Sequence, residues 1–269
     1  MIRRCLELRG VGVLSALLYF APTLARAEAA STPTTSLTSH IASRLDPTDF
    51  RSRFEIRNRY QSPQSGGYRN LFTARMDYAF SKSFSLRFEL PYVHSDPEKH
   101  LTPADTGLGD LAVRATYRVL RTPKMAFVVG TELISDTAES LALGAGKFTV
   151  APIVFASFDV PALHSTFFPT LQYFHSLGGD GHRVDVNYSS AKVFTLTRWP
   201  ASFYTGTEAV VFFDHERNNR VGATLEVETG RFLSPHIAVW VRPGIGIYGD
   251  DIPQVYNWNF ELGFRYLFD

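Results

Sequence analysis

The sequence predicts an all-β protein, a transmembrane antiparallel up-and-down β-barrel of about twelve strands. Three observations lead to this fold class. From residue 50 onward, apolar and polar side chains alternate with the two-residue period of a β-strand. The alternating segments are about 9 to 14 residues long, which suits a tilted strand that crosses a bilayer. Their connections alternate between short and long, as in outer-membrane barrels.

Residues 1–27 have the pattern of a secretory signal peptide. Arginines precede the apolar run VGVLSALLYFAPTLA, and Ala25-Arg26-Ala27 provides an A-x-A cleavage site. Cleavage there would leave 23 basic and 25 acidic residues, a formal net charge of −2. Because the mature chain is not basic, no nucleic-acid partner is expected. The single cysteine, Cys5, lies in the leader, so the mature chain is expected to hold no disulfide.

Residues 28–49 are rich in Ser, Thr and Pro and are expected to form a flexible lead-in to the barrel. Leu37, Ile41 and Leu45 stand four residues apart, which is also the spacing of one helix face. A short helix that plugs or caps the barrel is therefore the alternative for this segment. The barrel itself is expected to occupy residues 50–269.

The first barrel strand, FRSRFEIRNRY at residues 50–60, carries all of its charges on one side. Phe50, Phe54, Ile56 and Tyr60 fall on the opposite side. In lipid, the backbone polar groups must pair within the protein, so the sheet must close and its apolar side must face outward. The four arginines and the glutamate of this strand are therefore predicted to line the lumen.

The same alternation continues to the end of the chain. The segments in the middle are more apolar overall, and the one at 184–197 changes phase near Ser189 to Ala191, which predicts a β-bulge. The final segment matches the alternating pattern best. The predicted strands after the first lie near residues 68–80, 84–92, 110–119, 125–133, 148–158, 166–177, 184–197, 203–213, 221–228, 237–247 and 257–268.

The connectors set the strand count and the orientation. Ten or fourteen strands would survive a small change in the segment boundaries, but the most direct reading is twelve. An even number places both termini on the side of the short turns, which is periplasmic in outer-membrane barrels. Four prolines inside strand patterns, Pro91, Pro152, Pro169 and Pro243, require bulges or positions near the rim, because proline donates no ladder hydrogen bond.

The charged residues on the inward side of the strands are the predicted site. One interpretation is that lumenal acids neutralise the arginines of the first strand and that these side chains fill the barrel. The other is that part of the arginine row stays unpaired and attracts anionic or polar solutes. The predicted pore-lining residues are Arg51, Arg53, Glu55, Arg57, Arg59, Arg75, Arg87, Glu89, Asp110, Arg114, Arg118, Glu132, Glu226, Glu228, Arg242 and Arg265.

Signs of catalysis or metal binding are weak. Barrel lipid hydrolases use His-x-Ser, in which both side chains share one strand face, and this motif is absent from the sequence. The grouping of His175, Asp180 and His182, and that of His94 and His100, are more readily explained as polar loops than as metal sites. The expectation is a protein without enzymatic activity, metal or cofactor.

Several stretches resemble a Gram-negative outer-membrane family named after the meta-pathway of phenol degradation, whose members are described as transporters. They are TGLGDLAVRATYRVL at 106–120, LGAGKFTVAPIV at 143–154 and QYFHSLGGDGHRVDVNYS at 172–189. The closing FELGFRYLF is similar to the aromatic C-terminal strand by which the barrel-assembly machinery recognises its clients, although Asp269 follows the expected terminal Phe268.

The resemblance implies a location in the outer membrane, with outer-membrane lipid and a small-molecule solute as partners. The function expected from the sequence is an outer-membrane channel for passive passage of small molecules. The pattern fits polar, anionic and aromatic solutes alike. A non-conducting structural or adhesion barrel is the first alternative, and an outer-membrane lipid hydrolase is the second.

Overall fold

A computed structural model describes residues 44–97, 103–250 and 252–268 of the protein, and these residues form a closed β-barrel. The predicted signal peptide lies outside the described residues. Within the described ranges, no helix is long and apolar enough to span a membrane. The elements are β1 (Arg53–Pro63), β2 (Tyr68–Ala79), β3 (Phe84–Asp96), β4 (Asp105–Leu108), β5 (Ala112–Arg121), β6 (Met125–Ile134), β7 (Lys147–Val160), η1 (Pro161–Leu163), β8 (Ser165–Gly179), β9 (Asn187–Arg198), β10 (Phe203–Asp214), β11 (Arg220–Phe232), β12 (Ile237–Tyr248) and β13 (Tyr256–Leu267).

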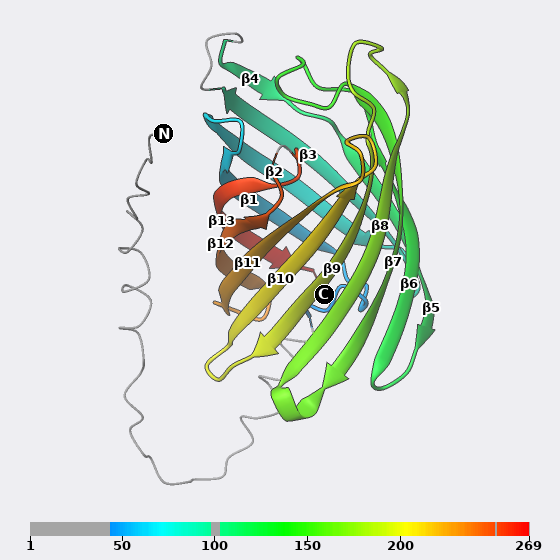
Figure 1. Cartoon of the computed structure of the whole chain (residues 1–269). Helices are drawn as coiled ribbons and strands as arrows, with labels where there is room; N and C mark the ends of the chain where they lie inside the picture. The colour runs from blue at the N-terminus through cyan, green and yellow to red at the C-terminus, as the bar shows by residue number, and fades with distance from the viewer. Residues whose placement is uncertain (1–43, 98–102, 251, 269) are drawn as a thin grey trace, which may run out of the picture. The chain divides into compact units, whose positions relative to one another are not determined.

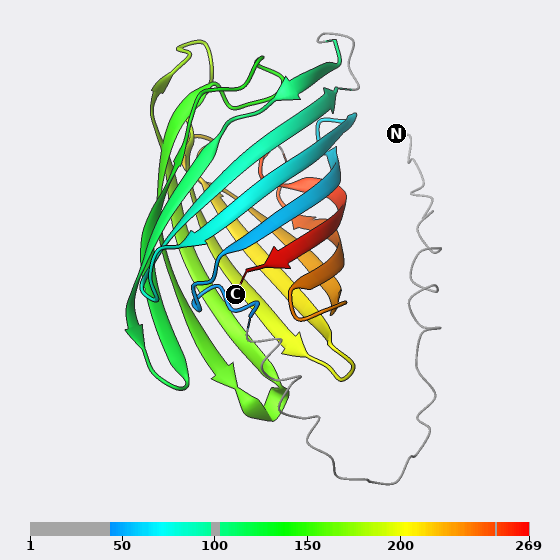
Figure 2. The same cartoon turned by 180° about the vertical axis from the view of Figure 1, so that it is seen from behind.

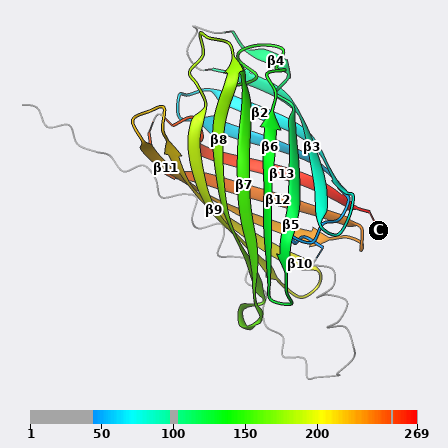
Figure 3. The same ribbon diagram turned by 90° about the vertical axis from the view of Figure 1, so that its right-hand side faces the viewer.

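Twelve long antiparallel strands close the barrel, which confirms the predicted fold class (Figures 1 and 2). Each strand pairs with its neighbour in sequence, and β1 pairs with β13 to complete the ring. The short β4 does not add a thirteenth strand to the ring, because β4 and β5 pair with successive parts of the same strand, β3. Figure 3 shows β5 to β9 as a row of adjacent strands. Arg53 lies opposite Leu267, so β1 begins where β13 ends.

The outer face of the barrel is apolar, as a lipid-facing surface must be. Phe72, Phe88, Leu90 and Leu262 are all more than two-fifths exposed, although they stand in the middle of strands. In a water-soluble sandwich, side chains of this kind would be packed inside. The burial pattern is therefore inverted relative to a soluble protein, and the barrel is a transmembrane one.

Each of the four strand prolines lies where one of its two ladders is interrupted. Pro152 pairs with Thr131 of β6, but the ladder to β8 has no partner for it. Pro169 pairs with Val193 of β9 and faces a gap in the ladder to β7. The same holds for Pro91 opposite the break between β4 and β5, and for Pro243 opposite β11. These gaps accommodate the missing N–H groups without the bulges or rim positions expected from the sequence.

The bulge predicted near Ser189 to Ala191 is absent. β9 keeps an unbroken register with both β8 and β10 through these residues. The pattern looked shifted because the inward side chains Phe194 and Leu196 are apolar, and they belong to an apolar cluster inside the barrel. Apolar residues on the inner face therefore mimicked a change of phase.

Residues 44–50 explain why the inner face is apolar in this region. They form turns inside the barrel, where Leu45 packs in a cluster that includes Phe168, Leu196 and Trp240. Phe50 packs against a second cluster of Val128, Ile153 and Phe155. The described part of the lead-in is therefore seated in the lumen and is not helical. Leu37 and Ile41 of the alternative helix lie outside the described residues.

Polar contacts fix the same segment to the wall. Thr48 is fully buried, and its Oγ1 donates to Ser157 Oγ of β7 at 3.2 Å. Arg118 Nη1 of β5 donates to the Thr48 carbonyl at 2.8 Å, and its guanidinium lies 5.8 Å from the centre of the Phe50 ring. Within the segment, Asp46 Oδ1 accepts from the backbone N–H of Thr48 at 2.7 Å. These contacts anchor the lead-in against β5 and β7.

Candidate functional site: the charged lumen

The lumen holds a partly enclosed cavity of about 660 Å³, lined by side chains from strands all around the barrel. The inward positions of β1, β2 and β3 contribute eight of the eighteen charged side chains that line it. Residues paired across adjacent strands point to the same face, so these side chains lie together. The predicted pore-lining residues that line this cavity are Arg51, Arg53, Glu55, Arg57, Arg59, Arg75, Arg87, Glu89, Arg114, Glu132, Glu228, Arg242 and Arg265.

Three residues of the predicted set lie elsewhere. Asp110 stands between β4 and β5, and its carboxylate accepts hydrogen bonds from the backbone N–H groups of Thr137, Ala138 and Ala145. It organises the connection between β6 and β7 instead of facing the cavity. Arg118 holds the lead-in, as described above. Glu226 is buried in the wall, where its Oε1 accepts from Tyr256 and Asn259 at 2.6 Å each.

The arginines of the first strand are all paired. Arg51 forms an ion pair with Asp49 at 3.0 Å, and Arg53 pairs with Asp77 at 2.5 Å. Arg57 pairs with Glu89 at 3.1 Å. Arg59 Nε donates to Glu261 at 2.9 Å, and its Nη2 lies 3.2 Å from Glu226. The row therefore has no unpaired member, and any excess charge must be found in larger groupings of ion pairs.

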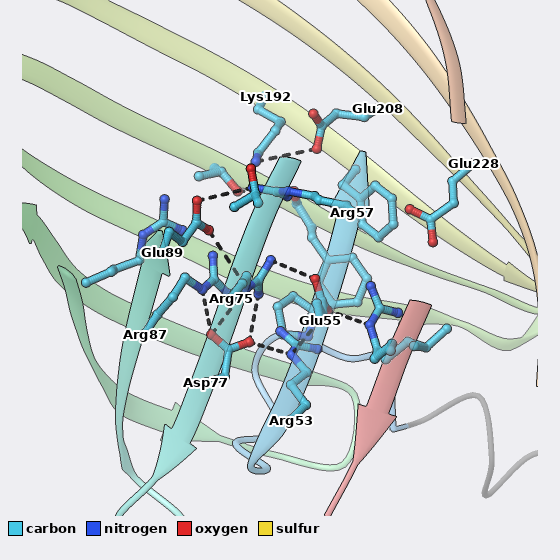
Figure 4. Close-up of a pocket in the computed structure, with 18 of the residues that line it drawn as sticks. Arg53, Glu55, Arg57, Arg75, Asp77, Arg87, Glu89, Lys192, Glu208 and Glu228 are labelled. Atoms are coloured by element: carbon cyan, nitrogen blue, oxygen red, sulfur yellow. Dashed lines mark hydrogen bonds and ion pairs between the residues drawn. The ribbon is translucent and has the colours of Figure 1, made fainter. Parts of the chain in front are cut away.

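One such grouping, which we call the basic network, joins β13, β1, β2 and β3 (Figure 4). Its centre is Arg75, which lies 2.7 Å from Asp77, 3.4 Å from Glu55 and 3.8 Å from Glu89. The other four arginines pair with these same three carboxylates, so ion pairs connect all members. The network consists of Arg53, Arg57, Arg75, Arg87 and Arg265 with Glu55, Asp77 and Glu89, so five guanidiniums share three carboxylates and the formal net charge is +2.

A second grouping, the acidic network, lies on β1, β11, β12 and β13. Arg59 bridges Glu226 and Glu261, and Arg242 contacts the same two glutamates and Glu228. Two guanidiniums therefore share three carboxylates, and the formal net charge is −1. No ion pair among the described residues joins this network to the basic one. The charges of the lumen are balanced almost completely in number but are separated in space.

Burial differs among the members of the basic network. The side chains of Glu55 and Asp77 retain 2% and 6% of their exposure, whereas Arg57 and Arg87 retain 23% and 19%. Glu89 is the one partly exposed carboxylate of the network, at 20%, so two guanidiniums and one carboxylate reach the cavity. Removing a carboxylate as deeply buried as Glu55 or Asp77 would leave uncompensated charge, so these ion pairs stabilise the structure.

Several lumenal residues were missed by the predicted site. Asp77, Lys192, Glu208 and Glu261 all line the cavity, and Lys192 pairs with Glu208 at 3.5 Å across β9 and β10. Lys192 was obscured because its strand seemed to change phase. The other three share the inward parity of neighbours that the pattern identified, so the register rule alone could have found them.

The lumen also has an aromatic wall, defined here as Phe174, Tyr188 and Phe194 on β8 and β9; Lys192, paired with Glu208, lies between the last two on the inward face of β9. Phe174 and Tyr188 stack with ring centres 4.3 Å apart. With twelve strands in the ring, strands six places apart face each other, so β8 and β9 lie opposite β1 and β2. The aromatic wall therefore faces the basic network across the cavity.

The histidines do not form a metal centre in the described part of the chain, where no group of three or more metal-binding side chains occurs. His175 stacks on Tyr173, and His182 bonds to the nearby Asp180 at 3.1 Å. His94 lies between the Tyr68 hydroxyl at 3.0 Å and Thr106 Oγ1 at 2.5 Å. His100 lies outside the described residues.

Comparisons with solved structures agree with the fold. An outer-membrane channel from Pseudomonas putida F1 matches with a TM-score of 0.67 at 12% identity, over 83% of this chain and 100% of that one. The NanC porin matches with a TM-score of 0.58 at 11% identity, over 79% of this chain and 98% of that one. The KdgM porin matches with a TM-score of 0.53 at 10% identity, over 81% of this chain and 99% of that one. No family model and no curated protein matches the sequence.

Proposed function

We propose that the chain is a channel in the outer membrane of a Gram-negative bacterium, through which small molecules pass by diffusion without catalysis or a cofactor. The observation that carries this proposal is the polar cavity of about 660 Å³ inside a closed, externally apolar barrel. A barrel that served only as an anchor or an adhesin could fill its interior with apolar side chains. This one keeps charged side chains around open space.

The similar structures support the same function. One is described as an outer-membrane channel, and two others are porins. A structure of KdgM is described as a complex with oligogalacturonate. At sequence identities of 10–12%, these similarities indicate a shared fold and not a shared solute. The cargo of this chain therefore has to be inferred from its own residues.

The proposal includes an orientation. The start of β1 and the end of β13 lie at the same end of the barrel, together with the tight connections at 122–124 and 199–202. We place this end in the periplasm, with both termini, because outer-membrane barrels have short periplasmic turns. The C-terminal strand would then be available to the barrel-assembly machinery, and the leader at residues 1–27 would be removed on export.

The quoted motifs favour a place in the meta-pathway family of transporters. The channel function does not depend on this assignment, because it follows from the barrel and its cavity. An enzymatic role is disfavoured by the absence of His-x-Ser, and it has a simple check. Lipid turnover by the folded barrel that disappears with His175→Ala would replace the channel with a hydrolase.

A liposome-swelling assay tests passage directly. Purified mature protein is folded into liposomes, which are then diluted into isotonic solutions of small neutral solutes of increasing size. Swelling that is fast for glycine and slower for larger sugars is expected, because a cavity of about 660 Å³ sieves by size. Swelling no faster than that of protein-free liposomes would instead support a non-conducting structural barrel.

A further inference from the structure

The basic network has an excess of positive charge over the carboxylates within ion-pair distance. Its five arginines share three carboxylates, and no other acid among the described residues forms an ion pair with them. Glu261 and Glu228 act on Arg57 and Arg265 only from a longer distance. The neighbouring Arg114 is paired with Glu132 at 2.9 Å, and this pair is neutral, so it leaves the net charge near the network unchanged. Positive charge in a partly enclosed cavity attracts anions from solution. The lumen therefore has a place for an anion.

The accessible part of this charge is carried by Arg57 and Arg87, with the carboxylate of Glu89 beside Arg57, so the exposed members have a formal net charge of +1. Each forms a close ion pair with a single carboxylate, Arg57 through Nη2 to Glu89 and Arg87 through Nε to Asp77 at 2.6 Å. A guanidinium has five N–H donors, so both retain donors for a second acceptor. Arg75, by contrast, is shared among three carboxylates and is only 10% exposed. Arg57 and Arg87 are thus the groups that a solute would meet.

The side of the cavity opposite the basic network favours an apolar part of a solute. Phe174, Tyr188 and Phe194 line it, and all three are partly exposed. Aromatic rings in a cavity bind apolar surface, and they prefer offset stacking with other rings. A solute that contacts both sides at once needs an anionic group at one end and an apolar body at the other.

We propose that the lumen binds a small monocarboxylate with an apolar body, its carboxylate on Arg57 and Arg87 and its body on the aromatic wall. A guanidinium matches the geometry of a carboxylate and can donate two parallel hydrogen bonds to it. The cavity volume lies within the range of about 300–1,000 Å³ that is typical of ligand sites. The role of this solute as a cargo rests on the proposed channel function. Its binding in the lumen depends only on the residues described above.

Binding to the folded, detergent-solubilised mature protein tests the proposal without requiring conduction. Isothermal titration calorimetry would compare sodium benzoate, sodium acetate and neutral benzyl alcohol as probes. Benzoate is expected to bind at least about tenfold more tightly than either of the others, because it alone satisfies both walls. Equal affinities for benzoate and acetate would overturn the proposal.

Variants assign the two walls. Arg57→Gln with Arg87→Gln is expected to weaken benzoate binding about tenfold or more, while Arg57→Lys with Arg87→Lys retains the charge and loses less. Phe174→Gln should reduce the preference for benzoate over acetate. Arg198→Gln is the matched control, since Arg198 pairs with Asp159 at 3.4 Å and does not line the cavity. Heat-dependent mobility on gels identifies which variants have folded.

The outcomes separate this proposal from the channel function. Liposomes that swell normally, together with unchanged benzoate affinity in the folded double glutamine variant, would overturn the carboxylate site and leave the channel standing. Selective benzoate binding in a barrel that does not conduct would support the site and remove the channel.

Discussion

Asp77 accepts a hydrogen bond from Arg87 Nε at 2.6 Å, while the same carboxylate pairs with Arg53 at 2.5 Å and Arg75 at 2.7 Å. One buried carboxylate from β2 therefore holds guanidiniums from three adjacent strands. Buried charges are costly unless they are paired, and a partner removed from such a group leaves the remaining charges uncompensated. Asp77 is thus the residue on which the basic network depends most.

Asp77→Asn should destabilise the folded barrel strongly. The substitution keeps the size of the side chain but raises the formal net charge of the network from +2 to +3, so we expect a loss of about 3–5 kcal/mol in the free energy of unfolding. Urea titration in detergent micelles measures it. Asp159→Asn is the control, because Asp159 lies at the rim, is 35% exposed and should cost at most about 1 kcal/mol. Equal losses would contradict a special role for Asp77.

The seat of the lead-in can be tested by a disulfide. Thr48 Oγ1 and Ser157 Oγ are 3.2 Å apart, and no cysteine occurs after residue 27. Thr48→Cys with Ser157→Cys should therefore cross-link under oxidation, and gel mobility with and without reductant reports it. Thr48→Cys with Thr195→Cys is the control, because Thr195 points to the lipid between the inward Phe194 and Leu196. Cross-linking of the control but not the test pair would place the lead-in elsewhere.

Removal of the lead-in should widen the lumen. Leu45, Pro47 and Asp49 line the cavity, so a chain without residues 28–49 is expected to show a larger single-channel conductance than the full mature chain. The matched control lacks only residues 28–43 and keeps the seated residues 44–49. If the two deletions conduct equally, residues 44–49 do not narrow the path.

An arginine on the outer face tests the inverted burial. Phe88 stands in the middle of β3 and is 46% exposed, and Phe88→Arg should cost about 2–4 kcal/mol in a bilayer, where charge on the lipid face is unfavourable. Val184→Arg provides the comparison, since Val184 is 60% exposed but lies between β8 and β9, outside the strands. Folding yields in liposomes should fall only for the first variant. A similar fall for both would argue against a lipid-facing outer surface.

Much of the fold could be predicted because the strand period is local. The alternation around Arg53 and Glu55 depends only on neighbouring residues, and it identified both the strand and its inward side. The same rule failed at β9, where Phe194 and Leu196 point inward to meet Leu45. A contact between residues some 150 positions apart leaves no trace in a local period, so an apolar inner face was taken for a bulge.

The sequence predicts which charged residues face the lumen better than it predicts how their charges are paired. Inward parity identifies Arg57, Arg87 and Glu89 one strand at a time. Whether an arginine is neutralised depends on which acids lie across the ladder, and this is fixed by register, as in the pairing of Arg75 with Glu89. The separation into a basic and an acidic network is a property of the closed barrel. It emerges only when β1 and β13 meet and Arg59 turns toward Glu261.

Single-channel recording of the full mature chain in a planar bilayer tests the central claim most directly. Purified, folded protein is added to one side of the membrane in KCl, and the current is recorded at constant voltage. The open cavity within the barrel predicts discrete, reproducible current steps. A folded, inserted protein that gives no steps above those of the protein-free membrane would contradict the channel function.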